Sequence, residues 1–490
     1  MNSKSPILVS ILIVLLIGMF SPAAAYQPKA ASEFSKVDEY VVSTMKELNI
    51  PGIAVGIVRG DRVLYLQGYG VADANRRLVT PQTPFMIGSL SKSITALAVV
   101  QLVEQGKIDL DAPVIAYLPW FRLADADDTA QITVRHLLNQ TSGIPGSAAG
   151  NYGDDKTSAE EFVRGLSALD LIVPVSSMFQ YSDANYVILG LIVEKVSGLA
   201  YAEYFQRNIF LPLEMKHSFV SKDIAAQNGL SVGYRTAFGF PVPADLPYPQ
   251  RYLPSGLVIS SAEDLAHYML LFLNGGKFQS SSIVSAESVL ELQRPAVELE
   301  HPEGYFYGMG WFVNDQYRTH TGELSNYYAI MQLTPADQTG VVVLANANNK
   351  LVTGEYTQVI ATGISELLNG REAPQPGNGF RQIYLIFDLV VLAIALSLLG
   401  RLIFSISRLR KKTKNQNAGL FSRLLALVGV DMLVLGLLGG VFFYLLSAFR
   451  TSLSNAMLGQ PDIVIAFFLL IGLAFINVLT RLTFTSLHRA

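Results

Sequence analysis

Residues 85–106 read FMIGSLSKSITALAVVQLVEQG, and the other segments of the chain can be placed relative to them. Within this stretch Ser89 stands three residues before Lys92, where a nearly continuous apolar run begins. One helical turn brings side chains three positions apart onto the same face. Gly106 is a natural helix end. We therefore predict a central helix from about Ser89 to Gly106 that stacks a hydroxyl beside an amine.

Taken alone, this Ser-x-x-Lys pair is also compatible with a capped helix that carries a solvated lysine. The apolar run that follows favours the chemical interpretation, because it would partly desolvate the amine of Lys92. Burial lowers the pKa of an amine, so that it can accept a proton from a neighbouring hydroxyl.

The composition indicates a chain that is partly in lipid. Of 490 residues, 50% are hydrophobic and only 15% are charged, and the length allows two or three domains. The chain has no cysteine, which excludes disulfides, thiolate catalysis and cysteine metal sites. The formal net charge is −3, and residues 383–490 are basic, so the preceding domain is acidic. An acidic domain argues against a nucleic-acid partner.

The N-terminus has the features of a signal peptide over residues 1–25. Lys4 precedes an apolar run at 7–20, and three alanines end at Ala25. An uncleaved anchor helix is the alternative, although the run is short for a membrane span. Both interpretations export the segment that follows.

The domain over residues 26–370 is expected to be α+β. The strand-like runs at both of its ends imply one mixed sheet closed by the two ends of the domain, with an all-helical subdomain inserted at about 109–250. Helices are expected at 32–48, 134–138, 159–166, 186–196, 261–273 and 356–368, and strands at 53–58, 63–67, 308–313, 327–333 and 341–346.

A linker at 371–382 separates this domain from a predicted membrane domain at 383–490. Three apolar runs have membrane length, at 383–404, 424–446 and 463–479. The loop between the first two is rich in Lys and Arg, whereas the next loop is not. The positive-inside bias therefore places the basic loop and the C-terminus in the cytoplasm and the large domain outside, periplasmic or on the outer face.

Asp388 and Asp431 fall within these spans. An intramembrane carboxylate raises the possibility of a transport function. Both residues lie near span ends, where water or a partner can satisfy them, and we favour that interpretation.

Two further segments carry candidate chemistry. Tyr181 precedes Ser182 and Asp183 on a predicted loop, and a tyrosine hydroxyl can relay protons when an ammonium is near. His320, Thr321, Gly322 and Glu323 begin a strand-like run.

Glycine at position 322 permits close backbone approach by a ligand, and an edge strand can bind an extended peptide by main-chain pairing. The backbone N–H groups of Glu323 and Ser89 would then form an oxyanion hole. Taken alone, the Tyr181 motif could be an ordinary turn with a packing tyrosine, and the His320-Thr321-Gly322 motif would mean little.

The three motifs, in this order, resemble those of the serine β-lactamase-like family, which includes class C β-lactamases, penicillin-binding D-Ala-D-Ala carboxypeptidases, esterases and D-peptidases. The resemblance covers about residues 33–370 and implies a β-lactamase/transpeptidase-like fold. Other segments that look like the family's are PGIAV at 51–55, TPFMIGS at 83–89, TVRHLLNQTSGI at 133–144, PSGL at 254–257 and SAEDL at 261–265.

The resemblance implies roles for individual residues. Ser89 would be the acylated nucleophile and Lys92 the amine that activates it. Tyr181 would pass a proton to the leaving group or activate water. Which of Lys92 and Tyr181 takes the serine proton stays open. His136 falls in a segment that is better interpreted as structural.

Two positions depart from the family pattern. Asp183 stands where asparagine is frequent, so an acceptor that can pair with Lys92 and repel a substrate carboxylate replaces an amide. His320 stands where β-lactamases usually have lysine, and a neutral imidazole is a poor carboxylate anchor. A protonated His320 would recognise an acidic substrate. Asn326 either bonds a substrate amide or is a turn residue.

We therefore expect a bacterial, membrane-anchored serine hydrolase that forms an acyl-enzyme on an amide or ester, with a D-residue peptide or an N-acyl-D-amino-acid cap as substrate. The membrane tail also resembles that of prodrug-activating peptidases. Alternatives are an esterase or weak β-lactamase of the same family, a catalytically idle penicillin-binding-like sensor, or a transporter with an exported accessory domain. The expected partners are a small peptide or ester and the lipid bilayer, and neither a metal nor an organic cofactor is implied.

Overall fold

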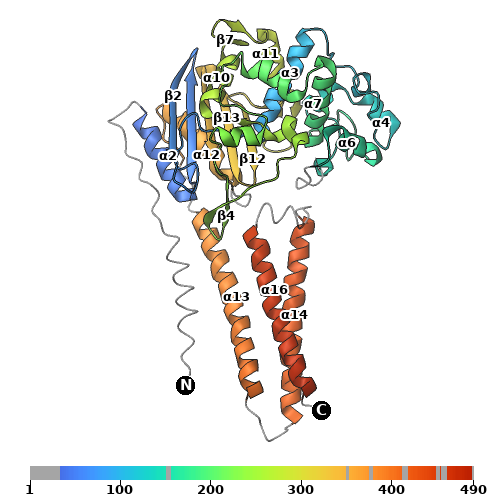
Figure 1. The fold of residues 1–490 in the computed structure, drawn as a ribbon, viewed down its shortest axis with the longest axis vertical. Coiled ribbons are helices and arrows are strands. Elements are labelled where there is room, and N and C mark those ends of the chain that lie inside the picture. The colour runs from blue at the N-terminus through green and yellow to red at the C-terminus, as the bar shows by residue number, and fades with distance from the viewer. Residues whose placement is uncertain are drawn as a thin grey trace.

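A computed structural model of the chain describes residues 34–149, 156–348, 353–374, 379–410, 418–448, 453 and 461–487. The predicted signal peptide at 1–25 lies outside the described residues, as do positions 375–378 of the predicted linker. A large α+β domain occupies one end of the molecule, and the long helices α13, α14 and α16 extend away from it (Figure 1).

The domain is built on an eight-stranded sheet in the order β2-β1-β14-β13-β12-β11-β10-β9. Every neighbouring pair in it is antiparallel. The expectation of a mixed sheet is therefore wrong, because most neighbours are joined by short turns, which reverse the chain. The strands are β1 (Gly52–Arg59), β2 (Arg62–Gly70), β9 (Val297–Glu298), β10 (Phe306–Tyr307), β11 (Phe312–Val313), β12 (Arg318–Leu324), β13 (Tyr327–Thr334) and β14 (Thr339–Ala345).

Both faces of this sheet are covered, which explains the continuous apolar runs of its central strands. On β1, Ile53 and Val55 face the core formed with α2 (Ser35–Leu48) and α12 (Thr353–Leu368), whereas Ala54 belongs to the larger core on the other face. There α10 (Ala262–Leu273) packs against β1 and β14. The predicted pairing of the N-terminal hairpin with the last strands of the domain is confirmed.

Helix α3 (Ser91–Glu104) runs through the larger core, beside α7 (Asp183–Ser197). It is buried from residue 91 to residue 102, so the helix is covered on all sides rather than along one stripe, and its few polar side chains, Lys92 among them, are buried with the apolar ones. The short helix η1 (Gly88–Leu90) leads into it. The remaining helices of the domain are α4 (Ala126–Gln131), α5 (Val134–Leu138), α6 (Ala159–Arg164), α8 (Tyr201–Phe205), α9 (Lys222–Gln227) and α11 (Ala286–Leu292), with the turn η7 (Leu253–Leu257).

The inserted region at 109–250 is mostly helical but not all-helical. It contributes β4 (Tyr234–Ala237) and β5 (Phe240–Pro243), which form a small sheet with β15 (Ala347–Asn348). The Gly and Pro content of this part of the sequence favours loops and short strands, and the hairpin pairs because β15 offers it an edge. Two short pairs complete the domain: β3 (Phe85–Met86) with β6 (Ile259–Ser260), and β7 (Lys277–Phe278) with β8 (Ser281–Ser282).

The helices α13 (Gly379–Arg410), α14 (Ala418–Ala448) and α16 (Pro461–Leu487) pack together through apolar side chains such as Leu398 and Leu470. Within the part of the chain that the structure describes, two segments are long and apolar enough to cross a membrane: Tyr384–Phe404, with mean hydropathy 2.3, and Asp462–Thr480, with 2.7. The apolar part of α14 is shorter among the described residues, at Val428–Tyr444. Two of the three predicted spans thus have support from length and composition.

Asp431 does not stand alone among these helices. Its carboxylate lies 2.5 Å from Nη2 of Arg401, and the Asp431 side chain is fully buried. The ion pair agrees with the interpretation of this residue as a partnered carboxylate.

Candidate active site

Ser89 lies where η1 passes into α3, and its hydroxyl contacts both predicted partners. Nζ of Lys92 donates a hydrogen bond to Oγ of Ser89 over 3.2 Å, and the phenol of Tyr181 donates to the same oxygen over 2.8 Å. The serine is partly exposed, whereas Lys92 is completely buried. A reachable hydroxyl held between an amine and a phenol is the arrangement of an activated nucleophile.

Nζ of the buried Lys92 side chain has a fixed set of acceptors. It forms an ion pair with Oδ1 of Asp183 at 2.5 Å, and it donates to the carbonyl of Ser255 on η7 over 2.7 Å. Asp183 begins α7, and its side chain is 20% exposed. The predicted pairing of Asp183 with Lys92 is therefore present in the structure, and the carboxylate balances a charge that would otherwise be costly to bury.

Tyr181 occupies the extended segment before α7. Burial, followed by the negative charge of Asp183, raises the pKa of the Tyr181 phenol well above 10, against the smaller opposing effect of its bond to Ser89. Nζ of Lys92 lies 4.7 Å from the centre of its ring. The phenol is therefore protonated at neutral pH, in a position to donate a proton at Oγ of Ser89.

Two glycines bring the backbone of β12 against η1. Gly88 has φ of 54°, and a Cβ there would lie 2.7 Å from the amide nitrogen of Glu323. A Cβ on Gly322 would lie 1.8 Å from the carbonyl oxygen of Ile87 and 3.2 Å from the amide nitrogen of Ser89. Neither position admits a side chain, and the two amide groups are neighbours as a result. The close approach at Gly322 is to the chain itself, not only to a ligand as the sequence suggested.

His320 is 1% exposed on β12, and its ring is engaged on both sides. Nδ1 donates to the carbonyl of Thr321 over 2.6 Å, and the hydroxyl of Tyr307 lies 3.4 Å from Nε2. Burial, followed by the positive charge of Lys92, lowers the pKa of His320 to about 3. The imidazole is neutral at physiological pH, which does not support recognition of a carboxylate by a protonated His320.

The other predicted residues of this strand separate into two groups. Thr321 is partly exposed and Glu323 is exposed, both beside the Ser89 segment. Asn326 is 2% exposed at the β12–β13 turn, and its amide donates to the carbonyl of Ala244 over 2.7 Å. Asn326 therefore holds the β4–β5 region against the turn and is not part of the catalytic cluster.

Three residues near the site were not predicted as contributors. The carbonyl of Ser255 was contained in a family-like segment, but nothing in the sequence indicated that it would accept from Lys92. The partly exposed rings of Phe179 and Phe312 lie 5.2 and 5.0 Å from the ring of Tyr307, next to Tyr181 and His320. Their only sequence signal is the position of Phe179 two residues before Tyr181.

An antiparallel sheet with a serine, a lysine and a tyrosine converging beside one of its strands defines the serine β-lactamase and penicillin-binding class. The model of the Beta-lactamase family matches residues 37–362, more than half of the chain, and the chain belongs to that family. The family typically consists of serine hydrolases.

Similar proteins match about two thirds of this chain. Flp of Staphylococcus aureus (strain MW2) is 28% identical over 66% of this chain, and the match spans 66% of the length of Flp. PbpX of Bacillus subtilis is 27% identical over 68% of this chain and 79% of that protein. The structure of the octameric penicillin-binding protein homologue from Pyrococcus abyssi is similar with a TM-score of 0.62 and 30% identity, over 70% of this chain and 78% of that one.

Proposed function

We propose that this protein is a membrane-anchored serine hydrolase that acts outside the cytoplasmic membrane on amide or ester bonds, with a peptide containing D-residues as its substrate. The observation that carries the proposal is the contact of Ser89 Oγ with Nζ of Lys92 and the phenol of Tyr181, at 3.2 and 2.8 Å.

In the acylation step Lys92 acts as the neutral amine: Oγ of Ser89 attacks the substrate carbonyl and its proton passes to Nζ of Lys92. Nζ returns this proton to Tyr181 after the phenol has protonated the leaving group. The amide groups of Ser89 and Glu323 stabilise the oxyanion that forms, because Gly88 and Gly322 allow them to converge. The phenol of Tyr181 then gives a proton to the leaving amine or alcohol. Its raised pKa keeps that proton in place until the leaving group becomes basic.

In the deacylation step, water attacks the acyl-enzyme and the same groups act in reverse. A proton passes from water to the Lys92–Tyr181 pair, and Oγ of Ser89 leaves as the hydroxyl. No metal or organic cofactor takes part in either proposed step.

The choice of a peptide substrate rests on β12. Along its whole length β12 pairs with β13, but β11 pairs only with Arg318 and Thr319. Among the described strands none pairs with the second edge from His320 onward. An extended peptide can add there by main-chain hydrogen bonds, next to Ser89.

The membrane and localisation parts of the proposal rest on α13 and α16. The candidate spans Tyr384–Phe404 and Asp462–Thr480 belong to these two helices, and 424–446 on α14 is proposed as the third. Helix α13 runs from the domain to the far end of the helix group (Figure 1). In the sequence, the end of this helix overlaps the basic run at 408–414. With that segment in the cytoplasm, the hydrolase domain and the exported N-terminus lie on the other side.

Covalent labelling tests the proposal. The detergent-solubilised chain should react with a fluorophosphonate or a labelled penicillin, and peptide mass spectrometry should place the adduct on Ser89. The variant Ser89→Ala should not be labelled. Labelling that survives this substitution would remove Ser89 as the nucleophile.

A substrate panel then separates the alternatives within the family. D-amino-acid amides, N-acyl-D-amino acids, short esters and a chromogenic cephalosporin should be compared by kcat/KM. Turnover of esters alone would make the protein an esterase, and an acyl-enzyme that forms but never turns over would favour the sensor.

A further inference from the structure

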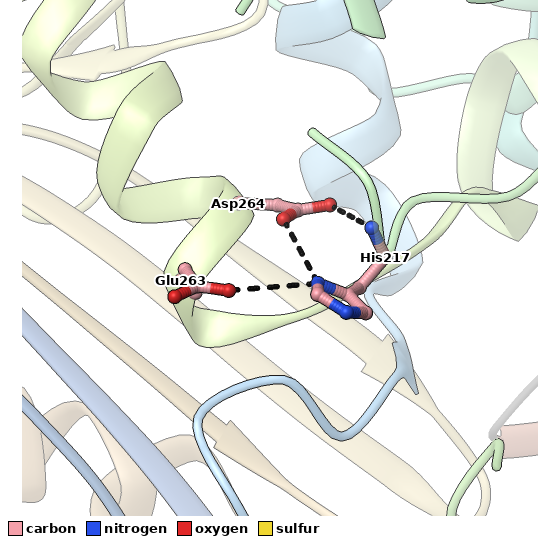
Figure 2. A group of neighbouring side chains, drawn as sticks. All are labelled: His217, Glu263 and Asp264. Atoms are coloured by element: carbon pink, nitrogen blue, oxygen red, sulfur yellow. Dashed lines mark hydrogen bonds and ion pairs between the residues drawn. The ribbon is translucent and has the colours of Figure 1, made fainter. Parts of the chain in front are cut away.

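A second cluster of titratable side chains lies outside the Ser89 site. His217 follows the inserted helices, and Glu263 and Asp264 lie in the first turn of α10. Figure 2 shows both carboxylates directed at the same ring nitrogen of His217. Nδ1 of His217 lies 3.5 Å from Oε2 of Glu263 and 3.6 Å from Oδ1 of Asp264.

Two atoms at the centre of this cluster are buried without a hydrogen bond. Asp264 is 1% exposed, and its Oδ2 accepts from the amide of His217 and the hydroxyl of Ser218, each over 2.7 Å. Within the described part of the chain, neither Oδ1 of Asp264 nor Nδ1 of His217 has a hydrogen-bond partner. A buried acceptor left in this state is costly, so the pair points to a ligand.

A shared proton satisfies these atoms poorly, and a metal ion satisfies them well. An N–H···O bond is ordinarily at most about 3.2 Å between heavy atoms, less than either separation from Nδ1. Zinc bonds of about 2.0–2.2 Å in a tetrahedral arrangement place the ligand atoms about 3.3–3.6 Å apart. The two separations from Nδ1 are close to this range, and all three ligand atoms lie within 4.8 Å of one another.

We propose that His217, Glu263 and Asp264 bind a divalent transition-metal cation of the zinc type. An imidazole nitrogen with two carboxylates favours such an ion over calcium or magnesium, which prefer oxygen ligands alone. Neighbouring groups already orient the ligands: Nε2 of Gln82 donates to Oε1 of Glu263 over 3.0 Å, which leaves Oε2 for the ion. The three ligands leave the fourth position to water.

The ion has a structural role in this proposal, because the cluster joins two segments that support Ser89. Phe219, two residues after His217, exchanges backbone hydrogen bonds with Ile259 on β6. Strand β6 pairs with β3, which leads directly to the Gly88–Ser89 turn. A cation bound between the His217 loop and α10 would hold the base of the nucleophile segment.

The test uses the full chain in detergent, stripped of metal and titrated with Zn²⁺ and with Co²⁺ as a spectroscopic probe. We expect one equivalent of either ion to bind, visible bands of tetrahedral Co²⁺, and a higher Tm with saturating Zn²⁺. Glu263→Gln and His217→Ala should each weaken binding about 100-fold or more, since each removes a direct ligand. The exposed residue His301 supplies the matched control, and His301→Ala should bind as the unchanged chain does.

Several results would overturn the site. One is a metal-stripped chain that takes up neither ion at micromolar concentration. Another is an octahedral Co²⁺ spectrum that persists in both Glu263→Gln and His217→Ala, since binding would then be elsewhere. Glu263→Gln keeps the shape of the side chain, so loss of binding in a variant with unchanged circular dichroism cannot be attributed to misfolding.

Discussion

The α+β domain and the group of long helices each contain an ion pair with one fully buried member. The buried member is the cation in the domain and the anion in the helices. In the α+β domain the cation is buried completely: Lys92 is 0% exposed and its partner Asp183 is 20% exposed. Among the long helices the anion is buried completely: Asp431 is 0% exposed and its partner Arg401 is 27% exposed. In both pairs the nitrogen lies 2.5 Å from the carboxylate oxygen.

The surroundings, rather than the burial, distinguish the two pairs. Lys92 also reaches a serine hydroxyl, beside a phenol and two backbone amides. Arg401 and Asp431, by contrast, pair with each other between α13 and α14. A buried charge therefore indicates a site only where a group that can react lies next to it, and it otherwise indicates packing.

The largest expected effect comes from removing one member of each pair. Lys92→Ala should lower kcat/KM for a model ester about 10³-fold, because the proton acceptor or its electrostatic support is lost. Arg401→Ala should leave kcat/KM unchanged and destabilise the helices, by about 3–5 kcal/mol if the uncompensated carboxylate stays buried. Ester kinetics and thermal unfolding in detergent measure both. Equal losses of activity would show that the helix pair also serves catalysis.

Gly322→Ala leaves the Lys92 pair intact and disturbs only its surroundings. The added Cβ would lie 1.8 Å from the carbonyl of Ile87, so β12 must move away from η1 and take the amide of Glu323 with it. We expect kcat to fall about 100-fold, the size of a lost oxyanion donor. Gly165→Ala is the control, since nothing lies within 4 Å of its Cβ position. Full activity in Gly322→Ala would argue against this oxyanion hole.

Asp183→Asn keeps the shape of the pair and removes its negative charge. A substrate carboxylate would no longer meet a like charge, and we expect its KM to fall about tenfold, a change of about 1.4 kcal/mol. Asp183 also contributes to the raised pKa of Tyr181, so that pKa should fall and the alkaline limb of kcat/KM should move to lower pH. Neutral esters serve as the matched substrates. A carboxylate preference that does not change would remove Asp183 from substrate selection.

The local parts of this site were predictable because they depend on spacing. Three residues of helix place Lys92 beside Ser89, and the resemblance supplied Tyr181 and the pairing capacity of Asp183. Asn326 was left open, because whether an amide faces the substrate or a neighbouring loop depends on the packing of the β4–β5 region.

The parts that failed depend on contacts distant in the chain. The mixed sheet was wrong because strand direction follows from how the ends of the domain meet, which no single segment encodes. His217 gave no signal toward Glu263 and Asp264, since the three residues meet only after the inserted helices have folded back onto α10. Burial of His320 was equally hidden, because the sequence of β12 is mostly polar, whereas the neighbouring residues Thr319 and His320 are both buried.

The smallest expected effect concerns His320. Like Lys92, His320 is a buried titratable side chain, but Lys92 has a carboxylate partner, whereas His320 is neutral at physiological pH. Its pKa of about 3 in the folded state lies below the ordinary value of 6.5, so the unfolded chain binds more protons between these values. Stability should therefore fall as the pH is lowered from about 6.5 toward 3, with a slope of at most about 1.4 kcal/mol per pH unit from this group. His320→Gln should reduce the loss of Tm between pH 7 and pH 4. The acid limb of the kcat/KM profile between pH 5 and pH 8 should stay the same. If the substitution instead shifts the acid limb, the His320 imidazole titrates between pH 5 and pH 8. Burial would then not keep this imidazole neutral.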